Sequence, residues 1–336
     1  MHKSVLLLGL ACAAATALGQ TTAPSSWELK DGGRWQQVTG PTTQPIAEPI
    51  LDRIEQMIQN KQPEPAKRMV VAWLRANKKS PVRDRGIYLL GQANFGYGDR
   101  VMAFYNFDEV LDRYPESRYY YPSLERQYDI ADQFLRGWKD SFLGLRILER
   151  KEEATEMLYR IQQRAPGTPL AEKALLRVAD YYYSSGQYDI AADAYAAYVR
   201  GYPRSPLIPR VRMKQAFATL AQFRGIDFDA TPVIDARRQL LDLSEAFPKL
   251  AEDENVGALV ARIDEALAKK LLSRARFYRR THKHSASAYY YRYLISMYPE
   301  SEEAQIARRE MPAKAPPAIE PGTTTLPALP TTRPSR

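Results

Sequence analysis

Five prolines, each preceded by the same arrangement of small and large side chains, constrain the fold of this chain more than any other feature. Alanine or serine stands twelve residues before each proline, and large apolar or aromatic side chains stand eight and five residues before it. Offsets of four and three lie on one face of an α-helix. A proline ends such a helix because its nitrogen has no hydrogen to donate. The chain thus repeats one kind of helix five times.

The five prolines are Pro115, Pro166, Pro203, Pro248 and Pro299. The small residues twelve positions earlier are Ala103, Ala154, Ala191, Ala236 and Ser287. The large residues eight positions earlier are Phe107, Leu158, Tyr195, Leu240 and Tyr291, and those five positions earlier are Val110, Ile161, Tyr198, Leu243 and Leu294. We expect the small residues to lie where a neighbouring helix comes close, and the large ones to fill the space beside them.

A second helix precedes each of these helices. Leu90-Gly91, Ala103, Phe107 and Pro115 resemble the tetratricopeptide pattern of Leu-Gly, Ala, an aromatic residue and Pro. A single hairpin of two helices cannot bury its own apolar face, so such hairpins stack. The sequence therefore predicts an all-α fold, an α-solenoid of about five to six tetratricopeptide-like helical hairpins, over residues 46–311.

The prolines are 51, 37, 45 and 51 residues apart, whereas the tetratricopeptide repeat has about 34 residues. We expect longer helices at 119–137 and 251–280 and an inserted loop at 223–232. Residues 46–79 read as a degenerate first hairpin that caps the stack. The Ser or Thr after the marker prolines is expected to cap the next helix, with Pro169 and Pro206 at first helical positions.

The ends of the chain differ in composition from the middle. Residues 1–19 read as a secretory signal peptide that ends in a small-x-small site, and Cys12 offers a second interpretation as a lipid-attachment residue. Both interpretations stay open. Residues 20–45 are expected to be mostly unstructured, with Trp27 and Trp35 docking part of them on the body. Residues 312–336 are rich in Pro and Thr, which predicts a disordered tail.

Residue patterns for catalysis, cofactors and metals are missing from the sequence. Cys12 is the only cysteine, and neither a phosphate-binding glycine loop nor a Gly-x-Ser-x-Gly elbow occurs. His282 and His284 are read as solvated turn residues, and Asp227-Phe228-Asp229 as an exposed loop. We therefore predict a protein that is not an enzyme and binds no cofactor or metal. The net charge is +9, but the sequence contains no recognised nucleic-acid-binding module, so nucleic acid is not expected as a partner.

Three trios of consecutive tyrosines begin at Tyr119, Tyr181 and Tyr289. Three neighbours on a helix spread over most of its circumference, so one of each trio should face the core. The others are expected either to line a partner-binding groove or to pack between helices. The candidate partner-binding residues are Tyr181, Tyr183, Tyr289, Tyr290, Arg276 and Arg280. The basic run from Arg274 to Lys283 fits anionic lipid, an acidic partner or a plain solvated face.

Residues 275–278 and 286–301 resemble the closing repeat of the BamD-like (YfiO-type) outer-membrane assembly lipoproteins, and 174–203 resembles their earlier repeats. This resemblance implies an exported scaffold in the periplasm, attached at the inner face of the outer membrane by lipid or peripherally. Its implied partners are a BamA-like β-barrel insertase and unfolded outer-membrane proteins. The alternative is a generic periplasmic adaptor for cell-wall or polysaccharide-export machinery. A helical arm of a wall-degrading enzyme would need a catalytic domain, for which no stretch remains.

Overall fold

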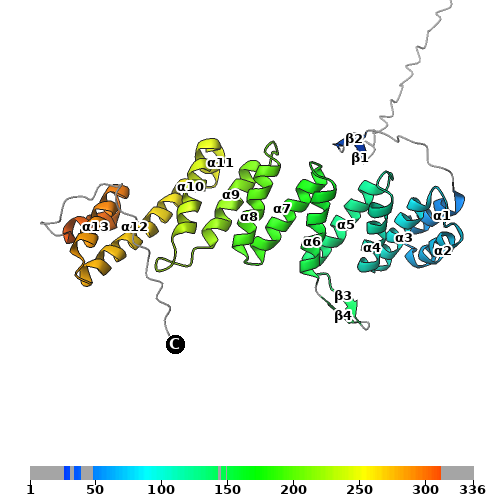
Figure 1. Cartoon of the computed structure of the whole chain (residues 1–336), viewed down its shortest axis with the longest axis horizontal. Helices are drawn as coiled ribbons and strands as arrows, with labels where there is room; N and C mark the ends of the chain where they lie inside the picture. Colours follow the sequence, from blue (N-terminus) through cyan, green and yellow to red (C-terminus); the bar gives the residue numbers. More distant parts are fainter. Residues whose placement is uncertain (1–25, 31–33, 39–47, 143–144, 149, 312–336) are drawn as a thin grey trace, which may run out of the picture. The chain divides into compact units, whose positions relative to one another are not determined.

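The computed structural model describes residues 26–30, 34–38, 48–142, 145–148 and 150–311 (Figure 1). The predicted signal peptide with Cys12 and the predicted tail at 312–336 lie outside these residues. The chain divides into two compact units, Met1–Ala171 and Glu172–Arg336. In the part of the chain that is described, no helix is both long enough and apolar enough to cross a membrane.

Unit 1 contains six helices, each packed against the next in the chain. They are α1 (Pro49–Gln59), α2 (Pro63–Ala76), α3 (Arg83–Tyr97), α4 (Arg100–Arg113), α5 (Tyr120–Leu135) and α6 (Lys151–Arg164). The predicted first hairpin is α1 with α2, and its core includes Ile54, Val70 and Trp73. Ile50 is about half exposed at the first turn of α1.

Unit 2 holds the remaining helices, and its boundary falls in the first turn of α7. They are α7 (Pro169–Ser184), α8 (Tyr188–Gly201), α9 (Ile208–Ala221), α10 (Thr231–Ala246), α11 (Pro248–Asp253), α12 (Val256–Arg280), α13 (His284–Met297) and α14 (Glu302–Glu310). Its core includes one cluster among α9, α10, α11 and α12 and another among α12, α13 and α14. The predicted fold class, an α-solenoid of tetratricopeptide-like hairpins, is confirmed by the helix pairs of both units.

The repeat positions read from the sequence are the core positions of the structure. All fifteen residues twelve, eight and five positions before the marker prolines are at most 1% exposed. They lie on α4, α6, α8, α10 and α13, the second helix of each pair. Ser287 shows how close the helices come, because its hydroxyl donates a hydrogen bond of 3.0 Å to the backbone carbonyl of Ala275 on α12. The small residues thus stand where the helices approach, as predicted.

The marker prolines end these helices in one geometry. The residue before each proline has φ between −129° and −139° and ψ between 54° and 66°. Proline excludes its predecessor from the helical conformation because its Cδ would collide with that residue. Thr168 and Ser301 then cap the next helix as predicted, by accepting from the amides of Ala171 and Ala304.

The capping prediction is wrong at two other repeats. Ser117 and Ser205 accept from the amides two residues further on, and the next helix begins three residues after each serine. Pro206 accordingly lies before α9 and does not occupy its first position. A turn stabilised by the serine hydroxyl competes with the cap at these positions.

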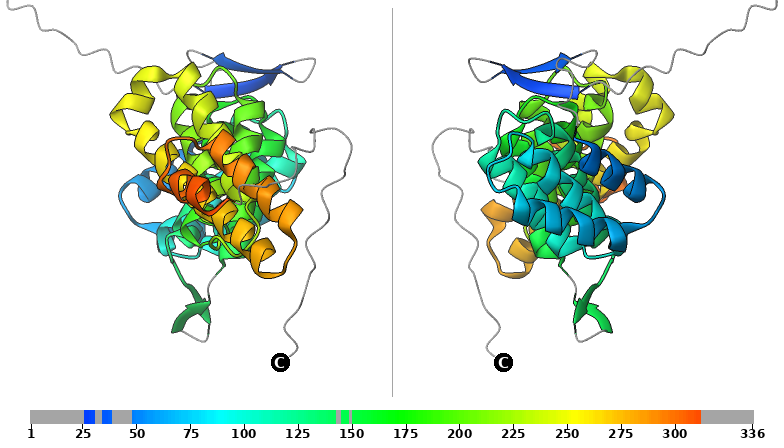
Figure 2. Two further views of the ribbon diagram at one scale, coloured as in Figure 1. Left: turned by 90° about the vertical axis from the view of Figure 1, so that its left-hand side faces the viewer. Right: turned by 90° about the vertical axis from the view of Figure 1, so that its right-hand side faces the viewer.

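The extra residues between the markers have three different structures. The helix predicted at 119–137 is α5, which at 16 residues is no longer than α7 or α10. The extra residues after it form an antiparallel hairpin of β3 (Asp140–Phe142) and β4 (Leu145–Leu148). This hairpin stands away from α5 and α6 in Figures 1 and 2. The predicted loop at 223–232 is confirmed in all but its last two residues, where α10 begins. The predicted extension at 251–280 is the 25-residue α12 with the short α11 before it.

The segment 20–45, for which the sequence predicts little structure, includes a second hairpin. Strands β1 (Ser26–Lys30) and β2 (Arg34–Val38) pair in antiparallel register and lie against α5. The Trp35 ring centre is 5.6 Å from that of Tyr120 and 5.8 Å from that of Tyr121. Aromatic rings at such distances attract each other beyond the area they bury. The expected docking of this segment by a tryptophan is confirmed for Trp35.

Gly91 tests the close approach of α3 and α4. A Cβ atom added to Gly91 would lie 2.6 Å from the Phe107 ring. We expect Gly91→Ala to lower the free energy of unfolding by about 1–2 kcal/mol, since overpacking outweighs the roughly 1 kcal/mol that alanine gains in a helix. Urea denaturation followed by circular dichroism measures this. Gly201→Ala is the matched control, because nothing lies within 4 Å of its added Cβ, and it should be neutral or stabilising.

Candidate functional site

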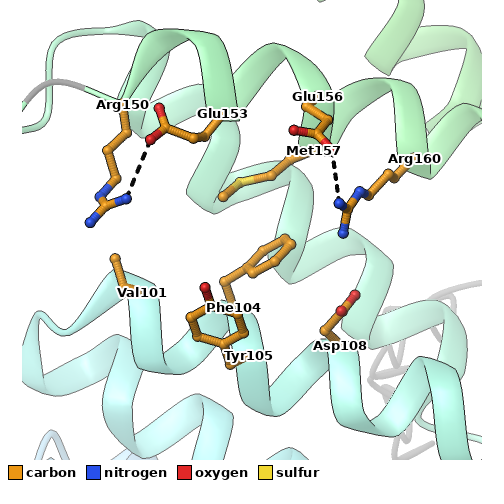
Figure 3. A pocket seen from close by; sticks show the side chains of 9 residues that line it. All are labelled: Val101, Phe104, Tyr105, Asp108, Arg150, Glu153, Glu156, Met157 and Arg160. Atoms are coloured by element: carbon orange, nitrogen blue, oxygen red, sulfur yellow. Dashed lines mark hydrogen bonds and ion pairs between the residues drawn. The ribbon is translucent and has the colours of Figure 1, made fainter.

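Unit 1 has a cavity of about 210 Å³ between α4 and α6 (Figure 3). Its apolar part consists of Val101, Phe104 and Tyr105 on α4 and Met157 on α6. The register explains why Val101 and Tyr105 are available, because the repeat positions buried on α4 are Ala103, Phe107 and Val110. Phe104 is itself buried and forms the floor of the cavity. Tyr105 is 61% exposed, which is unusual for an aromatic side chain of this size. The cavity is large enough for one or two apolar side chains of another molecule.

Charged side chains of both signs surround this cavity. Arg150 pairs with Glu153 at 3.4 Å, and Arg160 pairs with Glu156 at 2.8 Å (Figure 3). The hydrogen bond that Arg160 donates to Glu156 raises the pKa of Arg160. The two members of each pair are three or four residues apart, as in ordinary ion pairs on a helix surface. The sequence did not indicate the cavity itself, because Tyr105 and Met157 follow no repeat position.

Unit 2 places five aromatic rings in a continuous row over α12 and α13. Consecutive ring centres are 5.3–6.0 Å apart, and the two pairs Tyr278–Tyr290 and Tyr289–Tyr293 are stacked within 4° of parallel. In order, the row is Phe277, Tyr278, Tyr290, Tyr289 and Tyr293. Its two ends are exposed, Phe277 by 49% and Tyr293 by 42%. We call these five residues the aromatic row.

Tyr289 and Tyr290, both predicted as partner-binding residues, are in the aromatic row. The other three members were not predicted. A helical spacing of four links Tyr289 to Tyr293 and could have indicated the latter, whereas nothing in the sequence shows that Tyr278 of α12 stacks on Tyr290 of α13. The guanidinium of Arg274 lies 5.3 Å from the centre of the Tyr290 ring, within the range of a cation–π contact.

Arg276, another predicted residue, forms an internal ion pair. Its guanidinium donates to both carboxylate oxygens of Glu310 on α14, with a shortest distance of 2.6 Å. Arg279 and the hydroxyl of Tyr291 also contact Glu310, at 3.1 and 2.9 Å. Hydrogen bonds from Arg276 lower the pKa of Glu310 to about 2, and burial raises the pKa of Tyr291 to about 12. Arg276 thus attaches α14 to the last hairpin.

Arg280 is exposed at the end of α12, as its predicted role requires. Tyr181 and Tyr183 lie on α7, and the structure does not bring them into the aromatic row. The Tyr183 ring meets Tyr188 edge-on at 5.4 Å, and Tyr181 contacts Tyr182 at 5.5 Å.

The expectation that one tyrosine of each trio faces the core holds for two trios. Tyr121 and Tyr291 are buried, but none of Tyr181, Tyr182 and Tyr183 is. The buried stripe of α7 ends at Ala179, one turn before the end of the helix, so the trio at its last turn lies beyond the core.

The histidines and acids that were weighed as metal ligands lie in exposed positions. His282 is in the turn between α12 and α13 with a φ of 56°, and His284 begins α13. Asp229 accepts from the amide and hydroxyl of Thr231, and these hydrogen bonds lower its pKa. Among the residues that the structure describes, no group of three or more His, Cys, Asp or Glu side chains is arranged to hold a metal ion.

Paired helices buried at the repeat positions define this chain as a tetratricopeptide-type repeat protein. Residues 148–314 match the model of the YfiO family, described as outer membrane lipoprotein. The predicted resemblance to BamD-like (YfiO-type) proteins is confirmed by this match, which begins at β4 and α6 and takes in all of unit 2 that is described. No curated protein matches the chain in sequence.

Several solved tetratricopeptide structures are similar to the chain. The C-terminal part of a TPR repeat-containing protein from Cytophaga hutchinsonii is 14% identical, with a TM-score of 0.37 and coverage of 77% of this chain and 86% of that one. A tetratricopeptide repeat protein from Parabacteroides merdae is 13% identical, with a TM-score of 0.35 and coverage of 77% and 96%. PilF of Pseudomonas aeruginosa is 15% identical, with a TM-score of 0.30 and coverage of 78% and 96%. With TM-scores below 0.5, these structures say nothing further about the chain.

The Glu310 cluster predicts how unit 2 responds to acid. Its folded-state pKa of about 2 lies below the ordinary value of 4.5, so its stabilisation is complete above about pH 5 and is lost as the pH falls from there toward 2. We expect Glu310→Gln to lower the free energy of unfolding by about 1–3 kcal/mol at neutral pH and to weaken its dependence on pH below 5. Thermal melts from pH 7 to 3 measure both effects. Glu300→Gln, at an exposed position, should change little; an equal effect there would contradict the prediction.

Proposed function

We propose that this protein is a non-enzymatic scaffold that binds other proteins of the bacterial cell envelope, in the manner of the BamD-type component of outer-membrane β-barrel assembly. The match of residues 148–314 to the YfiO family carries this proposal. The helical hairpins support it, because proteins of this architecture present extended surfaces on rigid helices and recognise partners by shape and charge. The proposed location is the periplasm, at the inner face of the outer membrane, with Cys12 as a candidate lipid-attachment residue.

The cavity between α4 and α6 supports the binding of proteins in particular. It combines an apolar floor with an exposed tyrosine and a charged rim, which is the composition of a site for one anchoring side chain. The rim carries both signs of charge, and such patterns fix the register of a partner. We assign the cavity to an apolar anchor of a partner protein, and Tyr181 and Tyr183 on α7 to further protein contacts.

The proposed partners are a BamA-like β-barrel insertase and unfolded outer-membrane proteins. A generic periplasmic adaptor for cell-wall or polysaccharide-export machinery is the second candidate. Affinity purification of the tagged protein from its own cells, followed by mass spectrometry, separates them. Recovery of a β-barrel insertase supports the first, and recovery of wall synthases or export proteins without it would replace the first by the second.

Substitution in the cavity provides a residue-level test. We expect Tyr105→Ala to reduce recovery of the partner about tenfold or more, because an exposed aromatic anchor contributes to binding but little to folding. Recovery is compared by quantitative mass spectrometry. Ile50→Ala, at another exposed apolar position of unit 1, is the control and should leave recovery unchanged. Equal recovery with both variants would show that the cavity takes no part.

A further inference from the structure

From residue 266 onward, the last helical hairpin, α12 with α13, carries charge of one sign only. Residues 266–299 include eight Lys and Arg and not one Asp or Glu. In a chain with 48 basic and 39 acidic residues, a stretch of this length without an acid is a distinct feature. The eight cations are Lys269, Lys270, Arg274, Arg276, Arg279, Arg280, Lys283 and Arg292.

Half of these cations have partners inside unit 2. Arg276 and Arg279 pair with Glu310, and Lys269 pairs with Glu265. Lys270 donates to the backbone carbonyls of Ile226 and Phe228, and burial lowers its pKa. The acids of the neighbouring α14 also face cations of unit 2. Glu302 and Glu303 attract Lys269 electrostatically, and Glu310 forms ion pairs with Arg276 and Arg279.

The other four cations remain for an external partner. Within the described chain, Arg274, Arg280, Lys283 and Arg292 form no salt bridge, and Arg280 and Lys283 are exposed. Arg274, Phe277 and Arg280 are spaced three apart and lie along one side of α12. The cations therefore flank the aromatic row at Phe277, and Arg274 touches the row directly at Tyr290.

We infer that the aromatic row and these cations form a surface that binds the anionic face of a lipid bilayer. Phenol rings sit at the boundary between headgroups and acyl chains because one end is apolar and the other is polar. Lys and Arg beside them attract anionic headgroups, while their long stems lie along apolar surface. Phe277 and Met297, about half exposed, supply apolar side chains that can enter the boundary. The inference rests on the proposed function in one respect, namely that the protein works beside a membrane.

A specific acidic protein fits this surface less well. Protein interfaces use both signs of charge to set the register of the partner, as the rim of the α4–α6 cavity does, whereas this surface carries only one sign. An anionic bilayer requires no particular register and attracts a surface that carries only positive charge. The row also crosses from α12 to α13 as a continuous band of rings, which suits a broad surface.

Vesicle flotation with the purified mature chain, beginning at Gln20, tests the inference. The chain should bind vesicles of phosphatidylglycerol and phosphatidylcholine and bind vesicles of phosphatidylcholine alone far more weakly. The triple variant Arg274→Gln, Arg280→Gln, Lys283→Gln should lower the affinity for anionic vesicles about a hundredfold, roughly fivefold per charge. Phe277→Ser with Tyr293→Ser should also lower it, by about tenfold for each ring.

The matched control removes three exposed cations elsewhere in unit 2, as Arg204→Gln, Arg210→Gln, Lys249→Gln. It has the same net charge as the first triple variant and should bind within about twofold of the unaltered chain. Equal losses in both triple variants would show that net charge alone acts, and would overturn the inference. Thermal melts establish that each variant is folded.

Two further outcomes decide the assignment. Absence of vesicle binding, together with capture of polyglutamate that the first triple variant loses, would assign the surface to an acidic protein and overturn the inference. Brominated lipid should quench the fluorescence of Tyr293→Trp more than that of Leu207→Trp, whose side chain is similarly exposed. Because purified protein and lipid suffice, these results do not depend on whether an envelope partner is recovered from cells.

Discussion

The close contact between the two helices of each pair is the constraint on which the rest of the structure depends. A small side chain stands at this contact in all five repeats, and large side chains one and two turns further along fill the space that opens beyond it. At Ser287 the helices are near enough for a side-chain hydroxyl to reach the neighbouring backbone. A larger residue there would separate the helices and expose the aromatic or aliphatic side chain below it. The prolines determine where the second helix of each pair ends, and the chain leaves that helix with the same backbone conformation in all five repeats.

The second helix of each pair could be predicted from the sequence because five copies share one register. Insertions could not be predicted in the same way. A spacing of 51 residues between two prolines arises once from a β-hairpin, at 140–148, and once from a long helix, at 256–280. Chain length alone contains no information on which of these forms. The cavity between α4 and α6 was missed for a related reason, because it is lined by residues between the repeat positions, whose neighbours come from another hairpin.

Buried tyrosines determine how unit 2 uses its acids. A tyrosine at a repeat position places a hydroxyl in the core, and that hydroxyl needs an acceptor. Tyr195 donates to Asp180 at 2.6 Å, Tyr198 donates to Glu172, and Tyr291 donates to Glu310. Burial raises the pKa of each of these tyrosines, so all three are donors under physiological conditions. The carboxylates of α7 and α14 therefore have partners within unit 2, and two of them also form ion pairs with Lys214 and Arg276.

Because Glu310 accepts from the buried Tyr291, some other cations on α12 and α13 have no acidic partner within the described chain, and several rings of these helices lie outside the core. Of the trio on α13, the register takes only Tyr291 into the core, since a helix presents one of three consecutive residues to a given neighbour. Tyr290 packs at the edge of the core cluster, whereas Tyr289 is not part of it, so core packing does not require an aromatic residue at position 289. The rings of Tyr289 and Tyr290 join those of Tyr278 and Tyr293 in stacked contacts. Glu310 already binds two of the neighbouring arginines, Arg276 and Arg279. Fold stability thus accounts for the core face of this hairpin and not for its outer face, whose chemistry matches a second surface that is apolar and anionic.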